Sequence, residues 1–196
     1  MLDVQTAVLS NQAMNYLLSG RTPQRQGNRH PNIMPQDVFK CRDGEVVLAV
    51  GNDGQFGKMC VALGRSELAS DPRYVKNADR VRNMPELMTQ IAEIFAQWCR
   101  ADLVAALEAV GVPCGPINSI AEVFDLEQIK HRGMRMDLPH PRSGTVPSVA
   151  NPIKFQQAPT HYDRAPPTLG QHSEEILREA GYADSEIENL RSGGIV

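Results

Sequence analysis

The stretch VFKCRDGEVVLAV, residues 38–50, decides the fold, and the rest of the chain is best understood outward from it. Two runs rich in apolar and β-branched residues flank Arg42-Asp43-Gly44, and Asp-Gly between two such runs is a strong hairpin signal. The pattern predicts antiparallel strands at 38–41 and 45–50. A short antiparallel sheet is therefore expected near the start of a small domain.

Helical spacing follows the hairpin, with apolar residues recurring three and four positions apart. This spacing predicts helices over about 56–63, 84–99, 101–110 and 119–130. A capping box of Ser119 and Glu122 is expected to open the last of them. The Pro- and Gly-rich stretch 112–116 breaks all periodicity and predicts irregular chain.

The two ends of the chain differ from this centre. Residues 2–19 predict a helix with apolar side chains around much of its surface, which favours burial on more than one side. Short strands are expected at 134–138 and 145–149. A proline-rich extended connection is expected over 151–169, and two short helices over about 173–180 and 185–192. Both ends carry apolar surface that needs something to pack on.

Strands and helices do not alternate here as they would in a nucleotide-binding βαβ sheet. We therefore predict an α+β fold: a small domain with a short antiparallel sheet and surrounding helices, preceded by a linker helix and followed by an extended arm with two short helices. The linker helix and a loop occupy 1–36, the small domain 37–150, and the arm 151–196.

Composition narrows the classes of partner. The chain has 20 Lys and Arg against 23 Asp and Glu, a formal net charge of −3, so no excess of positive charge favours nucleic acid or an anionic membrane. No apolar run approaches the ~20 residues of a bilayer span, and no signal peptide is recognised at the start. Four cysteines without paired spacing predict reduced thiols, with no metal site. We expect a cytoplasmic protein.

Five motifs carry a resemblance to a known family: NQAMNYL at 11–17, GNRHPN at 27–32, LAVGNDGQF at 48–56, GVPCGPIN at 111–118 and RAPPTLGQH at 164–172. In this order and spacing they resemble the class III CoA-transferases, which include formyl-CoA and carnitine-CoA transferases. The resemblance runs from about residue 2 to the C-terminus. Since full-length members are much longer, the chain is similar to their C-terminal half only.

The resemblance implies that a Rossmann-like N-terminal half binds CoA and supplies the catalytic aspartate. No aspartate of this chain matches that position, so the chain alone is expected to be inactive. The implied chemistry passes through an enzyme-bound acyl anhydride, with a CoA thioester as substrate and no permanently bound cofactor. The implied partners are acyl-CoA, a carboxylic acid, and the missing half or a partner subunit, and the implied assembly is an interlocked homodimer.

The candidate site is a loop formed by Gly27, Asn28, Arg29, His30 and Pro31, called the 27–31 loop below. The resemblance places it near the CoA thioester, where formyl-CoA transferases have a run of glycines. Only one glycine remains here, so a stiffer loop is expected. Arg29 and His30 are candidates to contact an acyl carboxylate or the thioester oxygen. A solvated loop without substrate contacts is the alternative.

Other candidates have simpler structural explanations. The turn at 51–55 lacks a phosphate-loop pattern, and Asn52 or Asp53 is expected to cap the next helix. Cys114 has no Cys-His signature around it and is expected to be a structural thiol. Two other functions stay open: an α-methylacyl-CoA racemase of the same superfamily, and a non-catalytic truncated or assembly chain. The 111–118 motif favours the transferases.

Overall fold

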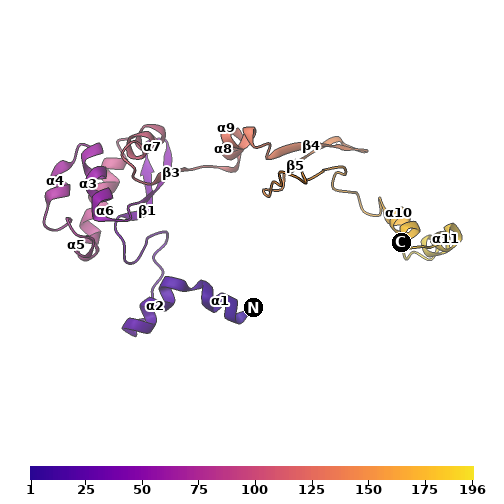
Figure 1. The fold of residues 1–196 in the computed structure, drawn as a ribbon, viewed down its shortest axis with the longest axis horizontal. Helices are drawn as coiled ribbons and strands as arrows, with labels where there is room; N and C mark the ends of the chain where they lie inside the picture. The colour runs from indigo at the N-terminus through magenta and orange to yellow at the C-terminus, as the bar shows by residue number, and fades with distance from the viewer. The chain divides into compact units, whose positions relative to one another are not determined.

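The computed structural model describes residues 1–196, which form two compact units, Met1–Ile117 and Asn118–Val196 (Figure 1). The first unit contains α1 (Leu2–Val8), α2 (Ser10–Ser19), β1 (Gln36–Cys41), β2 (Gly44–Ala49), α3 (Asp53–Ala62), α4 (Ser66–Ser70), α5 (Asn77–Arg82), α6 (Met84–Phe95), α7 (Arg100–Glu108) and β3 (Cys114–Ile117). The second contains α8 (Ile120–Asp125), α9 (Glu127–His131), β4 (Arg135–His140), β5 (Gly144–Val149), α10 (Ser173–Glu179) and α11 (Asp184–Ser192). The predicted α+β class is confirmed.

The sheet of the first unit has the antiparallel order β1-β2-β3. The predicted hairpin is present, with Val38 opposite Val47 across its two strands. The prediction of irregular chain at 112–116 was wrong, because Cys114–Ile117 forms a third strand beside β2. β3 lies at the edge of the sheet, where a proline such as Pro116 is tolerated because an edge strand has only one neighbour to bond.

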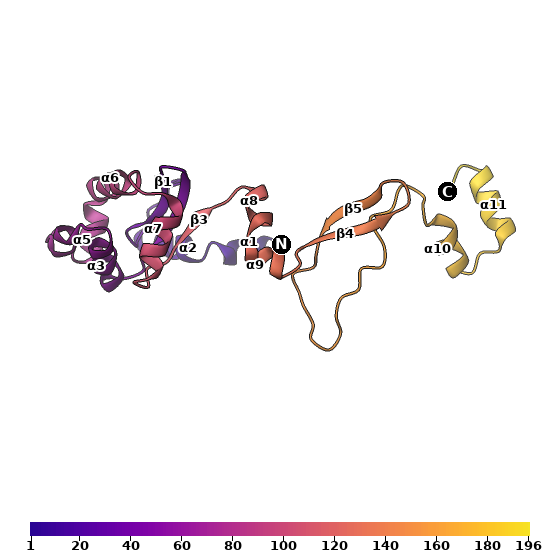
Figure 2. The same cartoon turned by 90° about the horizontal axis from the view of Figure 1, so that it is seen from above.

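The core of the first unit lies between this sheet and its helices: α6 lies beside β1 (Figure 2), and α7 packs on β2 and β3. α6 turns its predicted inner face to the core, including Leu87, Ile91 and Phe95. The rings of Phe39 and Phe95 join strand to helix at 5.0 Å between centroids. Full burial of an apolar side chain of this size stabilises a fold by about 1.5–3 kcal/mol. α4 and α5, which the apolar spacing did not predict, complete this unit.

The helix predicted over 2–19 is divided into α1 and α2. Ser10 has a φ of 44°, in the left-handed region, and this interrupts the helix. Neither helix buries any residue, and Leu2, Val8 and Leu18 are 79%, 69% and 81% exposed. Nothing in the first unit covers the apolar surface for which the sequence predicts burial.

The second unit is built from short elements. β4 and β5 pair as predicted, and the capping box of Ser119 and Glu122 opens α8. The helix expected over 119–130 is interrupted at Leu126, whose extended backbone separates α8 from α9. Ala150 and Ile187 are the buried apolar residues of this unit. So small a core supplies little hydrophobic stabilisation. The division of the chain at residues 36 and 150 stays a prediction.

Candidate functional site

The 27–31 loop belongs to the connection between α2 and β1. Gly27 has a φ of 66°, a left-handed conformation that glycine adopts without strain, and it forms the turn at the tip. Gly27 and Asn28 are exposed, whereas Arg29, His30 and Pro31 are half-buried. The loop therefore presents a free tip on a base that is held by the rest of the unit.

Arg29 holds the loop to the domain. Its Nε donates to the carboxylate of Asp37 on β1 at 3.2 Å, and its Nη1 lies 3.1 Å from the sulfur of Met84 at the start of α6. The side chain of Asp37 is only 17% exposed, so solvent screens this ion pair less than a pair on the open surface. Part of the guanidinium fork expected to face a substrate is thus engaged inside the chain.

His30 is fixed by backbone groups on its own loop. Its Nδ1 accepts hydrogen bonds from the N–H groups of Asn32 and Ile33, both at 3.1 Å. The backbone N–H of His30 donates to the carbonyl of Gln36 at 3.2 Å. Because a backbone N–H can only donate, Nδ1 carries no proton in this arrangement, and the proton of the neutral ring is on Nε2. The ring therefore offers an N–H donor on its other side.

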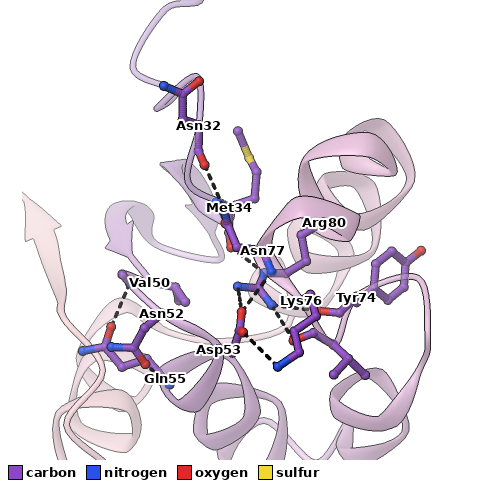
Figure 3. A network of polar contacts seen from close by, with 12 residues as sticks. Asn32, Met34, Val50, Asn52, Asp53, Gln55, Tyr74, Lys76, Asn77 and Arg80 are labelled. Carbon is purple, nitrogen blue, oxygen red and sulfur yellow. Dashed lines mark hydrogen bonds and ion pairs between the residues drawn. The ribbon is translucent and has the colours of Figure 1, made fainter. Parts of the chain in front are cut away.

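A polar network lies behind the loop (Figure 3). Asn77 is the first residue of α5, and its Nδ2 donates to the carbonyl of Asn32 at 2.8 Å. Its Oδ1 accepts from the N–H of Met34 at 3.0 Å. Its backbone N–H donates to Oδ1 of Asp53 at 2.9 Å. The carboxamide of Asn77 thus holds the chain on both sides of Ile33, and the backbone N–H of the same residue connects it to α3.

Arg80 is the fully buried cation of this network, with 0% exposure. It donates to the carbonyls of Met34 at 2.7 Å and Tyr74 at 2.8 Å, and to Oδ1 of Asp53 at 2.8 Å. Its guanidinium also lies 4.5 Å from the ring centroid of Phe56. A buried charge is tolerated only when it is paired and hydrogen-bonded, and Arg80 meets both conditions.

Asp53 is the anion of the network, at the start of α3. The hydrogen bond from Arg80 is the main cause that holds the pKa of Asp53 below its usual range, with further contributions from the charge of Arg80, the N–H of Asn77 and the charge of Lys76. Nζ of Lys76 lies 3.7 Å from Oδ2 of Asp53. Asn52 caps α3 by accepting from the N–H of Gln55, which confirms the capping role predicted for this turn.

Motifs that lie far apart in the sequence meet around the loop. Nδ2 of Asn32, in the 27–32 motif, donates to Oδ1 of Asn15, in the 11–17 motif, at 2.8 Å. The 48–56 motif supplies Asp53, and its Ala49 N–H donates to the carbonyl of Pro113, in the 111–118 motif, at 3.0 Å. Four of the five motifs are therefore joined through one region of the first unit.

Comparisons with known proteins identify the family of the chain. The model of CoA-transferase family III matches residues 1–173. The chain belongs to CoA-transferase family III. This family III chain is 47% identical, over 91% of its own length and 45% of the relative's, to the succinate–glutarate CoA-transferase of Agrobacterium fabrum. It is 36% identical, over its whole length and 45% of the relative's, to the human succinyl-CoA:glutarate CoA-transferase.

Solved structures of the family show the same fold. The crystal structure of a CAIB/BAIF family protein from Brucella suis superposes with a TM-score of 0.75 and 45% sequence identity, covering 90% of the family III chain and 46% of that protein. The chain spans about half the length of the relatives that it matches. This agrees with the predicted similarity to one half of the family's full-length members.

Cys60 and Cys114 of the family III chain have the surroundings of structural thiols. Burial is the main cause that raises the pKa of Cys114 to about 11 and that of Cys60 to about 12. Thiols with such pKa values stay protonated near neutral pH and are poor nucleophiles. The structure contains no group of three or more His, Cys, Asp or Glu side chains that could hold a metal ion. It also contains no helix long and apolar enough to cross a membrane.

Proposed function

We propose that the chain is the C-terminal half of a CoA-transferase that exchanges CoA between a dicarboxylic acyl-CoA, such as succinyl-CoA, and a second carboxylic acid, such as glutarate. The observation that carries the proposal is the 47% identity, along 91% of the chain, to the Agrobacterium fabrum succinate–glutarate CoA-transferase. The human relative has the same two acids in its name. Similarity to transferases favours CoA exchange over the racemase alternative.

The proposed chemistry is acyl transfer through covalent intermediates. An aspartate of the other half attacks the thioester carbonyl, forms an acyl anhydride and releases CoA thiolate. The thiolate then attacks the aspartyl carbonyl of the anhydride, forms an enzyme–CoA thioester and frees the donor acid. The acceptor acid repeats these steps in reverse order. No step changes an oxidation state, so the CoA thioester itself is the only carrier required.

In this proposal the 27–31 loop faces the acyl end of the CoA thioester. Support comes from the exposed tip and from the His30 ring, which offers Nε2–H on the side away from its backbone contacts. Arg29 is engaged by Asp37, so we assign it to holding the loop. We assign the contact with the thioester oxygen or the distal carboxylate to His30, assisted by the exposed amide of Asn28.

The apolar surfaces at the two ends of the chain support the proposal that these ends pack on the rest of the enzyme. α1 and α2 bury no residue, and the second unit has only two buried apolar residues. We propose that residues 1–36 and 151–196 pack on the CoA-binding half, and that the assembled enzyme is a cytoplasmic homodimer of the interlocked type.

A chimera tests the proposed function. Residues 2–196 replace the matching part of the Agrobacterium fabrum enzyme, and glutaryl-CoA formed from succinyl-CoA and glutarate is measured by liquid chromatography. We expect turnover within about tenfold of the parent enzyme, and none from the 196-residue chain alone or from the isolated large half. A folded chimera with no turnover, or a large half that is as active without the chain, would overturn the proposal.

A further inference from the structure

We propose that Asn77 is a positioning residue that sets His30 as a hydrogen-bond donor, through Nε2, toward the oxygen of the acyl group. The substrate that His30 faces rests on the proposed function. The positioning itself is a property of this chain, and it can be measured without substrate.

The first step is the pair of hydrogen bonds between Asn77 and the backbone on either side of Ile33. Its carboxamide donates to the carbonyl of Asn32 and accepts from the N–H of Met34, at 2.8 and 3.0 Å. These two bonds require one donor and one acceptor on the same side chain, which a carboxamide supplies and a carboxylate or a methyl group does not. The backbone around Ile33 is therefore held in one orientation.

The second step passes from this backbone to the ring. The N–H of Ile33 belongs to the peptide whose carbonyl Asn77 bonds, and the N–H of Asn32 lies on the peptide just before it; both point to Nδ1 of His30 at 3.1 Å. A change in the orientation of these two peptides would remove both donors from Nδ1. The ring would then be free to turn and to exchange its proton between the two nitrogens.

The third step is the anchor of Asn77 itself. Its backbone N–H is bonded to Asp53, and Asp53 is bonded to the fully buried Arg80. Arg80 also donates to the carbonyl of Met34, on the same segment. Asn77 therefore transmits the position of the buried core to the 27–31 loop.

His140 provides an internal comparison. His140 is the last residue of β4, and its Nδ1 accepts from the N–H groups of the turn residues Arg142 and Ser143, both at 3.2 Å, in the same pattern as His30. The pattern alone thus serves to stabilise a turn. His30 differs from His140 because the carboxamide of Asn77 bonds the backbone that donates to its ring, and the buried Arg80 bonds the same stretch of backbone at Met34.

The positioning is tested first on the intact chain by hydrogen exchange of individual amides. Asn77→Ala should speed exchange at Asn32, Ile33 and Met34 by at least about tenfold, because these are the amides that it holds directly or through His30. Asn83→Ala is the matched control, since the side chain of Asn83 bonds only to the carbonyls of Arg73 and Asp79, near the other end of α5. Unchanged exchange in Asn77→Ala would overturn the positioning role.

The variant Asn77→Asp separates the loss of the hydrogen bond from a general loss of folding. It keeps the size of the side chain and an acceptor for the N–H of Met34, but it cannot donate to the carbonyl of Asn32. We expect faster exchange at Asn32 and Ile33 with the thermal midpoint within a few degrees of the parent. Protection equal to that of the parent chain would contradict the proposal.

Kinetics of the chimera then test the link to His30. We expect Asn77→Ala to lower kcat/KM about tenfold, and the double variant Asn77→Ala/His30→Ala to be no slower than His30→Ala alone, because both changes remove one function. Multiplied losses would show that Asn77 acts independently of His30 and would overturn the inference. Normal kcat/KM for His30→Ala, combined with faster exchange in Asn77→Ala, would refute the proposed role of His30 and leave the positioning intact.

Discussion

Replacing Arg80 with methionine should destabilise the first unit strongly. Arg80 is 0% exposed and makes four hydrogen bonds, three to the carbonyls of Met34, Tyr74 and Val75 and one to the carboxylate of Asp53. Methionine fills much of the same volume over Phe56 but donates no hydrogen bond. The variant therefore leaves these acceptors without their donor while changing little of the apolar packing.

The size of the loss in unfolding free energy follows from the hydrogen-bond acceptors that Arg80→Met leaves unpaired. Breaking a buried ion pair by removing one partner costs about 3–5 kcal/mol. Asp53 is 41% exposed and regains water, which favours the lower end of that range, whereas the carbonyls freed in the interior favour the upper end. We expect a loss of about 3–4 kcal/mol of unfolding free energy, which corresponds to a fall in Tm on the order of 10 °C.

Urea unfolding followed by circular dichroism measures this loss. Arg82→Met is the matched control, because Arg82 is on the same helix with a side chain that is 72% exposed and pairs only with Asp79. An exposed pair of this kind contributes about 0–1 kcal/mol. If Arg80→Met and Arg82→Met lost similar amounts of stability, the buried network would not hold the loop base as described.

Two further predictions concern the network and the linker helices. Because the pKa of Asp53 is lowered in the folded state, its contribution to stability is present above the unfolded pKa of about 4 and is lost as the pH falls through the folded pKa. The stability gap between the parent and Asp53→Asn, followed by urea unfolding, should therefore close as the pH falls below about 4, and a gap that widened there would contradict the pairing. The chain should also bind a hydrophobic dye through the apolar groove along α1 and α2, and Leu9→Glu/Leu17→Glu should reduce the dye fluorescence without lowering Tm. Unchanged fluorescence would place the apolar surface elsewhere.

Much of the fold was predictable because its signals are local. The Asp-Gly turn predicts the hairpin of β1 and β2, and the spacing of apolar residues predicts the buried face of α6. The capping box of Ser119 and Glu122 predicts the start of α8. Each of these signals lies within a few residues of the element that it specifies.

The parts that were not predictable depend on contacts between distant segments. β3 contains Gly115 and Pro116, which have low strand propensity, and it is a strand because the edge of β2 pairs with it. Arg80 is on a short helix where a charged residue normally indicates solvent exposure, and only the meeting of α5 with Met34 and Asp53 buries it.

The candidate site shows the same limit. The family resemblance points to the 27–31 loop, but no local pattern shows that Arg29 pairs with Asp37 or that Asn77 holds the backbone next to His30. The sequence suggests the same role, contact with substrate, for Arg29 and His30. The contacts separate the two residues, because Arg29 is engaged within the domain while one side of the His30 ring stays available.

The most direct measurement of the proposed site is the kcat/KM of the chimera carrying His30→Ala, with succinyl-CoA and glutarate as substrates. Loss of one hydrogen bond to a charged or developing anionic oxygen, worth about 1.5–3 kcal/mol, predicts a roughly ten- to hundredfold decrease. His140→Ala removes a histidine with the same backbone bonding in the second unit and should leave kcat/KM unchanged. Equal kcat/KM for His30→Ala and the parent chimera would contradict a loop that contacts the acyl group.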